Sequence, residues 1–208
     1  MNKKTNLLIC LMILLCICIA GCGFQPRESV TSPMRYVESY DGVSVGVPEH
    51  PERVLALSSA ADTILLGLIE PNRLVGINKL STYEEYSLEA KRAKLVKPVL
   101  GSYPLEKVIA LKPDLVIAPD YTSADVIDGL RHMGIPTVVV PTPSTVEEVI
   151  HNITDIAHVV GEDEKGQLYT QKIRRELDEM KRLGASIPVE QRKSVLFVSS
   201  MDGYTGTG

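Results

Sequence analysis

Short apolar runs alternate with helical segments from Arg53 onward, and this alternation constrains the fold more than any other feature. The apolar runs lie at Val54–Leu57, Leu74–Ile77, Val99–Leu100, Asp114–Ala118 and Thr137–Val140. The segments between them are typical of helices: 60–68, 84–93, 104–111, 123–133 and 145–160. Strands that are apolar at successive positions are buried on both faces, and connecting helices are typical of a parallel sheet. We therefore expect an α/β fold, with a parallel-sheet N-terminal lobe and flanking helices over residues 34–160. Asp41-Gly42 predicts a hairpin turn at the start of this lobe.

The segment 145–160 carries the clearest helical pattern. Ser144 and Glu147 match a capping box, in which each side chain satisfies backbone amides of the first turn. His151 and His158 lie on the polar face, which we expect to be solvated rather than to bind a metal. Six apolar residues fall on the other face at helical spacing: Val146, Val149, Ile150, Ile153, Ala157 and Val160.

The segment Asp163–Leu183 is dense in charge and has only a narrow apolar seam. Gly184 fits a helix C-cap. A helix of this length spans about 30 Å. It is too polar to be buried, but it could bridge two globular bodies. We therefore predict an interdomain helix over residues 161–185. The seam consists of Tyr169, Ile173, Leu177, Met180 and Leu183.

A new apolar run at Ser194–Val198 follows that helix and predicts a strand. Residues 199–208 are rich in Gly, Ser and Thr, and no further element follows them. We interpret residues 186–208 as the start of a second α/β lobe of which only the first strand is present. The sequence is therefore expected to be C-terminally truncated.

The first 22 residues have the pattern of an export signal. Lys3 and Lys4 precede an apolar run over 7–19, and small residues come directly before Cys22. A cysteine at that place resembles the bacterial lipobox, in which the thiol is lipidated after cleavage. An uncleaved membrane helix is the alternative, but the run is short for a span of about 20 residues. We predict a signal peptide over 1–21, lipidation at Cys22, and a Pro-containing tether over 22–33.

The composition of the remaining chain excludes several classes of protein. Without residues 1–21 there are 20 basic and 26 acidic residues, a formal charge of −6, which argues against a nucleic-acid partner. Cys22 is then the only cysteine, so neither a disulfide nor a cysteine metal site is expected. With no Trp and two Phe in the sequence, the core must be aliphatic.

Several of these segments together resemble one family of proteins. "PERVLAL" at 51–57, "LEKVIALKPDLVIAPD" at 105–120 and "MGIPTVVV" at 133–140 occur in the order found in the binding proteins of iron-complex and vitamin B12 ABC importers. The hairpin, the long charged helix and the lipobox fit the same family, so the resemblance covers about residues 34–208. It implies two α/β lobes joined by a rigid helix, with the ligand in the cleft between them.

The ligand site is expected beyond the carboxyl ends of the parallel strands. Tyrosines on loops there offer a flat apolar face and a hydroxyl, which suits a large ring system or a metal chelate. The resemblance places Tyr83 at an aromatic ligand contact, and Tyr204 would face it from the second lobe. Ser59 is a further candidate, although the first expectation for Ser58 or Ser59 is that it serves as the N-cap of the following helix. The predicted ligand-binding residues are Tyr83, Ser59, Tyr103, Tyr121 and Tyr204.

The resemblance also implies a ligand and partners. The ligand is an iron–siderophore complex, haem or a corrinoid, and no resident cofactor or metal is expected. Basic residues near the loops are few, chiefly Lys79 and Lys97, which favours a neutral chelate over an anionic catecholate. Glu106 matches a glutamate that docks on the permease of an ABC permease/ATPase complex. The protein is expected on the extracytoplasmic face of the cell membrane, held by its lipid anchor.

Three other interpretations remain open from the sequence. A zinc-binding importer component would need histidines on the cleft loops, whereas the four histidines here are dispersed: His50, His132, His151 and His158. A membrane-anchored α/β enzyme would need a convergent nucleophile or acid–base pair, and no GxSxG, HExxH, Walker A or dinucleotide motif is present. A non-functional or regulatory fragment is the third, and for the 208-residue chain alone we expect weak ligand binding or none.

Overall fold

The computed structural model describes residues 33–194, 198–201 and 204–207, with side-chain detail through Ser194. The described chain begins with an antiparallel hairpin of β1 (Met34–Glu38) and β2 (Ser44–Pro48). Gly42 adopts φ 77° in the connecting turn, a left-handed conformation that glycine accepts without strain. The hairpin predicted from Asp41-Gly42 is therefore confirmed. The predicted signal peptide, the lipidation site Cys22 and the tether lie outside the described residues.

Five parallel strands form the centre of the lobe. They are β3 (Val54–Ala56), β4 (Ile77–Asn78), β5 (Val99–Leu100), β6 (Leu115–Pro119) and β7 (Thr137–Val140). β6 pairs with both β3 and β7, β4 pairs with β5, and a parallel bridge from Val54 to Leu74 joins the two groups. The spatial order is thus β5-β4-β3-β6-β7, so the chain leaves β3 first toward one edge and later toward the other.

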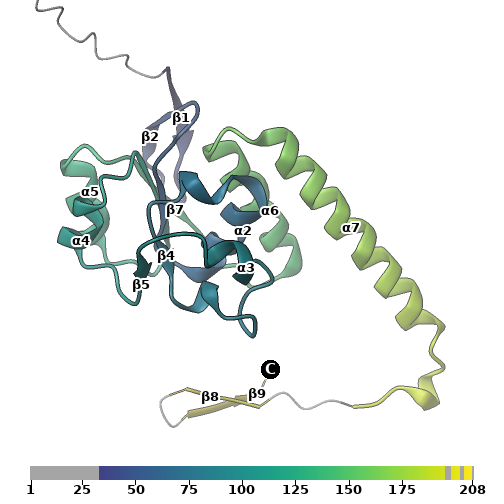
Figure 1. Ribbon diagram of the computed structural model, residues 1–208. Helices are drawn as coiled ribbons and strands as arrows, with labels where there is room; N and C mark the ends of the chain where they lie inside the picture. The colour runs from purple at the N-terminus through teal and green to yellow at the C-terminus, as the bar shows by residue number, and fades with distance from the viewer. Residues whose placement is uncertain (1–32, 195–197, 202–203, 208) are drawn as a thin grey trace, which may run out of the picture. The chain divides into compact units, whose positions relative to one another are not determined.

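Helices cover both faces of these strands (Figure 1). α4 (Leu105–Ala110) and α5 (Ala124–His132) lie on one side, and α2 (Ser59–Leu68) and α6 (Val146–Val159) on the other. Shorter elements connect them: the 3₁₀ helices η1 (Pro71–Arg73) and η2 (Leu80–Thr82), and α3 (Ala90–Ala93). The predicted parallel-sheet α/β fold is confirmed.

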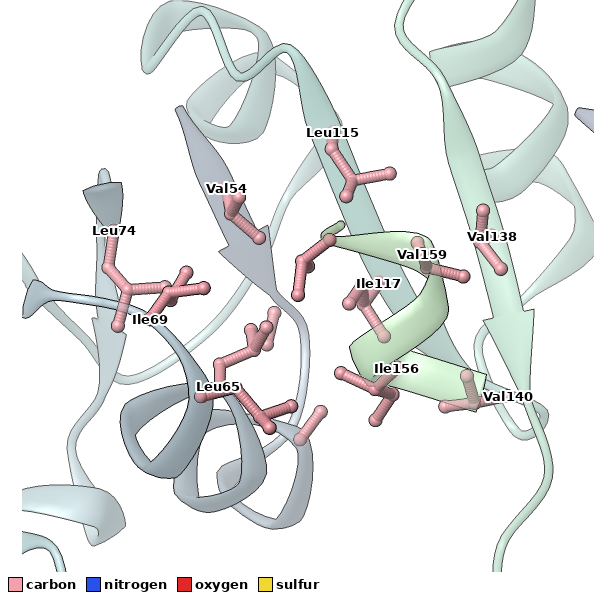
Figure 2. Packing of buried hydrophobic residues seen from close by; sticks show 14 of the residues in the cluster. Val54, Leu65, Ile69, Leu74, Leu115, Ile117, Val138, Val140, Ile156 and Val159 are labelled. Atoms are coloured by element: carbon pink, nitrogen blue, oxygen red, sulfur yellow. The ribbon is translucent and has the colours of Figure 1, made fainter. Parts of the chain in front are cut away.

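Successive residues of the strands pack alternately into two separate hydrophobic cores, one on each face of the sheet. Val54 and Ala56 of β3 belong to a cluster with α2 and α6, whereas Leu55 and Leu57 belong to a second cluster with α4 and α5. Figure 2 shows the first cluster, where strand and helix side chains meet. Because successive strand residues point to opposite faces, continuously apolar strands are required when both faces are covered. The labelled residues of Figure 2 are Val54, Leu65, Ile69, Leu74, Leu115, Ile117, Val138, Val140, Ile156 and Val159.

Two predicted segments differ in extent from the structure. The helix expected over 84–93 is confined to Ala90–Ala93. Ser87 accounts for the shorter helix, because its hydroxyl accepts a hydrogen bond from the Glu89 amide and bonds with Thr63, which competes with helical pairing. The strand expected over Leu74–Ile77 forms at Ile77–Asn78, with only a bridge at Leu74.

The capping box of α6 forms one residue later than predicted. Thr145 accepts from the Glu148 amide at 3.2 Å, and Glu148 accepts from the Thr145 and Ser144 amides. Glu147 instead pairs with Arg174 at 2.9 Å. Val146 is half exposed, so the buried face of α6 is deepest from Ile150 onward.

The long charged helix is α7 (Asp163–Ser186), which passes through Gly184 and ends at Ile187. The predicted C-cap at Gly184 is therefore wrong; the helix stops where Pro188 restricts the preceding residue. Along the predicted seam, Tyr169 and Ile173 are half-buried, whereas Met180 and Leu183 are 59% and 66% exposed. Leu177 is also half-buried, so only the last two residues of the predicted seam are exposed.

Two glycines allow α7 to approach the lobe closely. A Cβ on Gly166 would overlap the Cβ of Ala157 in α6, and a Cβ on Gly67 in α2 would lie 2.7 Å from a ring carbon of Tyr169. Gly161 precedes α7 with φ 75°, where a Cβ would overlap the backbone oxygen of Glu49. These contacts leave no room for side chains, so the start of α7 has a fixed position on the lobe.

The last described strands form a separate antiparallel pair, β8 (Val198–Met201) and β9 (Tyr204–Thr207), after the 3₁₀ helix η3 (Val189–Gln191). The strand predicted over 194–198 overlaps β8 only at Val198, and residues 195–197 lie outside the described chain. Among the described helices, none combines the length and apolar character that crossing a membrane requires.

Candidate ligand pocket

An open pocket of about 390 Å³ lies at the carboxyl ends of β3, β6 and β7. The chain reverses its direction of travel across the sheet between β3 and β6, and such a switch point separates the loops that follow the two strands. α2 and α6 form the walls, and α7 contributes Tyr169 and Ile173. The lining residues are Ser58, Ala60, Ala61, Thr63, Ile64, Pro119, Tyr121, Val140, Pro141, Thr142, Pro143, Val149, Asn152, Ile153, Ile156, Tyr169 and Ile173.

The first turn of α2 borders this pocket. Ser58 is the N-cap, since its side chain accepts from the Ala61 amide at 3.2 Å. Ser59 is the first helical residue and half-buried, and its carbonyl accepts from the Thr63 hydroxyl. Of the two serines, Ser58 is therefore the cap and lines the pocket, while Ser59 lies beside it and its ligand role stays a prediction.

Tyr121 is the predicted tyrosine that lines the pocket. It follows β6 and is 72% exposed, so its ring is available to a ligand. Its neighbour Asp120 accepts from the amide and the hydroxyl of Thr142 at 3.1 and 2.6 Å, which ties the loop after β6 to the loop after β7. The Thr142 hydrogen bonds hold the pKa of Asp120 below its usual value.

Tyr103 has a different environment. It is half-buried after β5, and its phenol oxygen accepts from the Asn78 side chain at 3.0 Å. Burial, and then the charge of Asp62, raises its pKa well above 10. Tyr103 packs against the core cluster on the α4 and α5 face and is not among the residues that line the pocket.

Tyr83 is not among the residues that line the pocket. Tyr83 ends η2, is 39% exposed, and meets Tyr86 edge to face with ring centroids 6.4 Å apart. Tyr204 is in β9 opposite Met201, and its side chain lies outside the described detail. The loops of Tyr83, Tyr103 and Tyr121 all follow carboxyl ends of parallel strands, as expected, but only Tyr121 contributes to the pocket.

Sequence reasoning missed two features of this region. Asn152 of α6 lines the pocket and donates to the Pro141 carbonyl at 2.8 Å, which fixes the loop after β7. Asp62 is completely buried in α2, where its carboxylate accepts from the loop after β4. An acidic residue inside the apolar segment 60–68 was the one signal available for Asp62. Nothing in the local pattern distinguishes Asn152 from a surface residue.

Among the described residues that line the pocket there is no Lys, Arg, His, Asp or Glu, so this lining is uncharged. The four histidines are exposed and separate: His158 pairs with Asp163 and His151 with Glu147. In the part of the chain that the structure describes, no three His, Cys, Asp or Glu residues are grouped to hold a metal ion. The lining therefore suits a neutral, largely apolar ligand rather than a bare cation or a polyanion.

Glu106 lies in the first turn of α4 and is exposed. A carboxylate there interacts favourably with the helix dipole, so its presence has a local explanation. Its exposure leaves it accessible to a partner, and its docking role stays a prediction.

A doubly wound parallel sheet with a pocket at its switch point is the architecture of α/β proteins that bind small molecules. The chain belongs to the periplasmic binding protein family, whose model matches residues 54–208. The family resemblance predicted from the sequence is confirmed, and it favours a binding protein over the α/β enzyme kept as an alternative.

Two curated relatives illustrate this membership. An uncharacterised ABC transporter substrate-binding lipoprotein of Bacillus subtilis (strain 168), YvrC, is 25% identical over 97% of this chain and 66% of its own length. A vitamin B12-binding protein of Vibrio parahaemolyticus is 29% identical over 64% of this chain and 47% of its own length. The chain thus spans about half to two thirds of the length of these relatives.

A solved structure agrees with the fold. The haem-binding protein HmuT matches with a TM-score of 0.61 and 25% identity, over 81% of this chain and 56% of that one. The shared region is again about half of the longer protein.

Proposed function

We propose that this chain is the ligand-binding part of an extracytoplasmic ABC importer component that captures a metal chelate with a large apolar surface. The open, uncharged pocket at the carboxyl ends of β3, β6 and β7 is the observation that carries this proposal. An iron–hydroxamate complex, haem or a cobalamin-type corrinoid fits the chemistry of the lining. No resident cofactor takes part, because the chelate is cargo and leaves unchanged.

The lining supports this ligand class on two grounds. Apolar walls from α2, α6 and α7 gain free energy by covering a broad apolar ring, at about 25 cal/mol per Å² removed from water. Tyr121 adds an aromatic face and a hydroxyl at the exposed rim. A ferric catecholate would require cationic groups, which the lining lacks. The vitamin B12 and haem ligands named for the relatives belong to the favoured class.

Ligand titration tests this proposal. Cyanocobalamin, haem and a ferric hydroxamate are added to the full chain, with equilibrium dialysis and tyrosine fluorescence as readouts, since the sequence has no Trp. For this chain, which spans about half to two thirds of the length of its relatives, we expect weak but saturable binding of at least one chelate. Tyr121→Ala should weaken that binding about tenfold, a loss of about 1.4 kcal/mol. Tyr36→Ala is the matched control, because Tyr36 is exposed on β1 and does not line the pocket. Equal effects of the two variants, or no saturable binding, would contradict the proposal.

The same proposal includes a membrane anchor and a transporter. Lipidation at Cys22 holds the protein on the extracytoplasmic face of the membrane, and the lipoprotein relative supports this. Cys22→Ala should release the protein into the soluble fraction after export. Exposed Glu106 docks on the permease of the ABC permease/ATPase complex. Glu106→Ala should then lower stimulation of the ATPase, whereas Glu164→Ala, at the start of α7, should not.

A further inference from the structure

Asp62 is the one ionisable residue among the buried side chains of the described chain. It lies in the first turns of α2, whose other buried residues are apolar. Transfer of a carboxylate from water to the interior is costly unless hydrogen bonds compensate. The hydrogen bonds of the Asp62 carboxylate therefore indicate which part of the lobe it stabilises.

The carboxylate binds the last residue of β4 and the segment that follows it. Oδ2 accepts from the Asn78 backbone amide at 2.7 Å and from the Ser81 hydroxyl at 2.9 Å. Oδ1 is buried and has no hydrogen-bond partner. Ser81 is itself completely buried, so Asp62 holds this segment through one backbone amide and one buried hydroxyl.

Asn78 extends this contact to a second loop. Its side-chain amide donates to the Tyr103 phenol oxygen at 3.0 Å, and its side-chain oxygen accepts from the Leu80 amide at 2.9 Å. A continuous chain of hydrogen bonds thus runs from Asp62 to Asn78 to Tyr103. It connects α2, which borders the pocket, with the loops that carry Tyr83 and Tyr103.

We propose that Asp62 is a positioning residue, whose carboxylate sets the conformation of the 78–83 loop and of Tyr103, and whose protonation relaxes both. Hydrogen bonds to an ionised acceptor are about twice as strong as those to a neutral one. A proton added at the unpartnered Oδ1 makes Oδ2 a neutral, weaker acceptor for Asn78 and Ser81. The consequence for ligand affinity rests on the proposed function, but the loop change itself does not.

The surroundings allow this proton to be gained near neutral pH. Asp62 forms no ion pair with any described Lys, Arg or His; the titratable group that faces it is Tyr103, which Tyr121 influences in turn. Burial raises the pKa of Asp62 to about 7, although the Asn78 and Ser81 hydrogen bonds oppose that rise. The neutral phenol of Tyr103 leaves the Asp62 charge unbalanced at this end of the sheet.

Amide hydrogen exchange of the full chain, followed by NMR, tests the proposal without any ligand. We expect the protection factor of the Asn78 amide to fall about tenfold from pH 8.5 to pH 5.5, with a midpoint near 7. The Val116 amide, which bonds to the Pro136 carbonyl on the opposite side of β3, should not change. In Asp62→Asn the Asn78 protection should be independent of pH.

A second variant keeps the test decisive if Asp62→Asn fails to fold. Ser81→Ala removes one donor from the ionised form, so the midpoint of the Asn78 transition should move to higher pH. An unchanged midpoint in Ser81→Ala, or Asn78 protection that is independent of pH in the unsubstituted chain, would overturn the positioning role.

Cyanocobalamin titration at pH 8.5 and pH 5.5 separates this inference from the proposed function. If the loop responds to pH and cyanocobalamin affinity changes in the unsubstituted chain but not in Asp62→Asn, both ideas are supported. If the loop responds but no chelate binds at either pH, the proposed function fails and the positioning role stands.

Discussion

The two ends of the central sheet are built in opposite ways. At the amino ends of the strands, charged groups are closely paired: Arg73 bonds to Glu162 at 2.8 Å and to the Pro51 and Val160 carbonyls. Asp114 likewise accepts from the Glu52 and Arg53 amides. At the carboxyl ends lie an uncharged pocket and a buried carboxylate with an unpartnered oxygen.

This difference shows that stabilising contacts and ligand binding are located at opposite ends of the same sheet. At the amino ends, the Arg73–Glu162 ion pair and the hydrogen bonds to Asp114 connect the strand starts with the residues before α7. The carboxyl ends keep polar groups only partly satisfied and apolar groups partly exposed. Such a surface is less stable by itself, and it is the end at which a ligand can add contacts.

The largest expected effect comes from the buried carboxylate. The pKa of Asp62 is about 7 in the folded chain and 3.8 in its ordinary state, so the folded chain retains this proton longer. Its contribution to the free energy of unfolding is therefore full below pH 4 and is lost as pH rises to 7. Relative to the unsubstituted chain, Asp62→Asn should gain up to about 4 kcal/mol between pH 4 and pH 8, measured by urea unfolding.

Glu162, at the amino ends of the strands, should change stability with pH in the opposite direction. Burial raises its pKa, but hydrogen bonds from Lys165 and Arg73 outweigh burial and hold it below the usual value. Its stabilising contribution is present above its ordinary pKa of 4.5 and is lost as pH falls through the lower folded pKa. If the stability difference between Asp62→Asn and the unsubstituted chain were the same at pH 4 and pH 8, Asp62 would not destabilise the carboxyl ends when ionised, and the proposed difference between the two ends would be wrong.

The next largest effect is expected at the turn before α7. Gly161→Ala should destabilise the chain by about 3 kcal/mol, because the left-handed backbone is strained for alanine and the new Cβ meets the Glu49 oxygen. Gly134→Ala is the matched control: its φ is also 75°, but no atom lies near the new Cβ, so the cost should be about 1 kcal/mol. Equal costs in urea unfolding would show that the amino-end corner is not tightly packed.

The smallest effect concerns the two halves of α7. Ile173→Ala should cost about 1 kcal/mol, because this half-buried side chain packs between α7 and the lobe. Met180→Ala should change the free energy of unfolding by less than about 0.5 kcal/mol, since Met180 is exposed. A larger loss for Met180 than for Ile173 would mean that the helix contacts the lobe elsewhere than described.

The apolar patterns of the strands predicted the fold well, because a sheet with a core on each face requires apolar residues at successive strand positions. Continuous apolar strands such as Leu115–Pro119 have no other explanation than burial on both faces. Boundaries were less certain where neighbouring residues fit the same rule: Ser144 and Thr145 are both good caps, and Glu147 and Glu148 both follow at helical spacing. Gly184 likewise fits a C-cap locally, but Pro188 ends the helix.

The candidate site could be predicted only to the level of loops. The parallel order of the strands placed Tyr83, Tyr103 and Tyr121 at the carboxyl ends. Which of them lines the pocket depends on packing between loops distant in sequence, as the Asn78–Tyr103 hydrogen bond shows. The burial of Asp62 depends in the same way on a loop that follows it by 16 residues.

The close approach of α7 at Gly67 and Gly166 has a geometric consequence. From Gly166 to Ser186 the helix extends for about 30 Å, at 1.5 Å per residue. A rotation of only about 5° at the glycine contacts would displace its far end by about 3 Å. The absence of a Cβ at Gly67 and Gly166 therefore determines how precisely the C-terminal end of α7 is positioned.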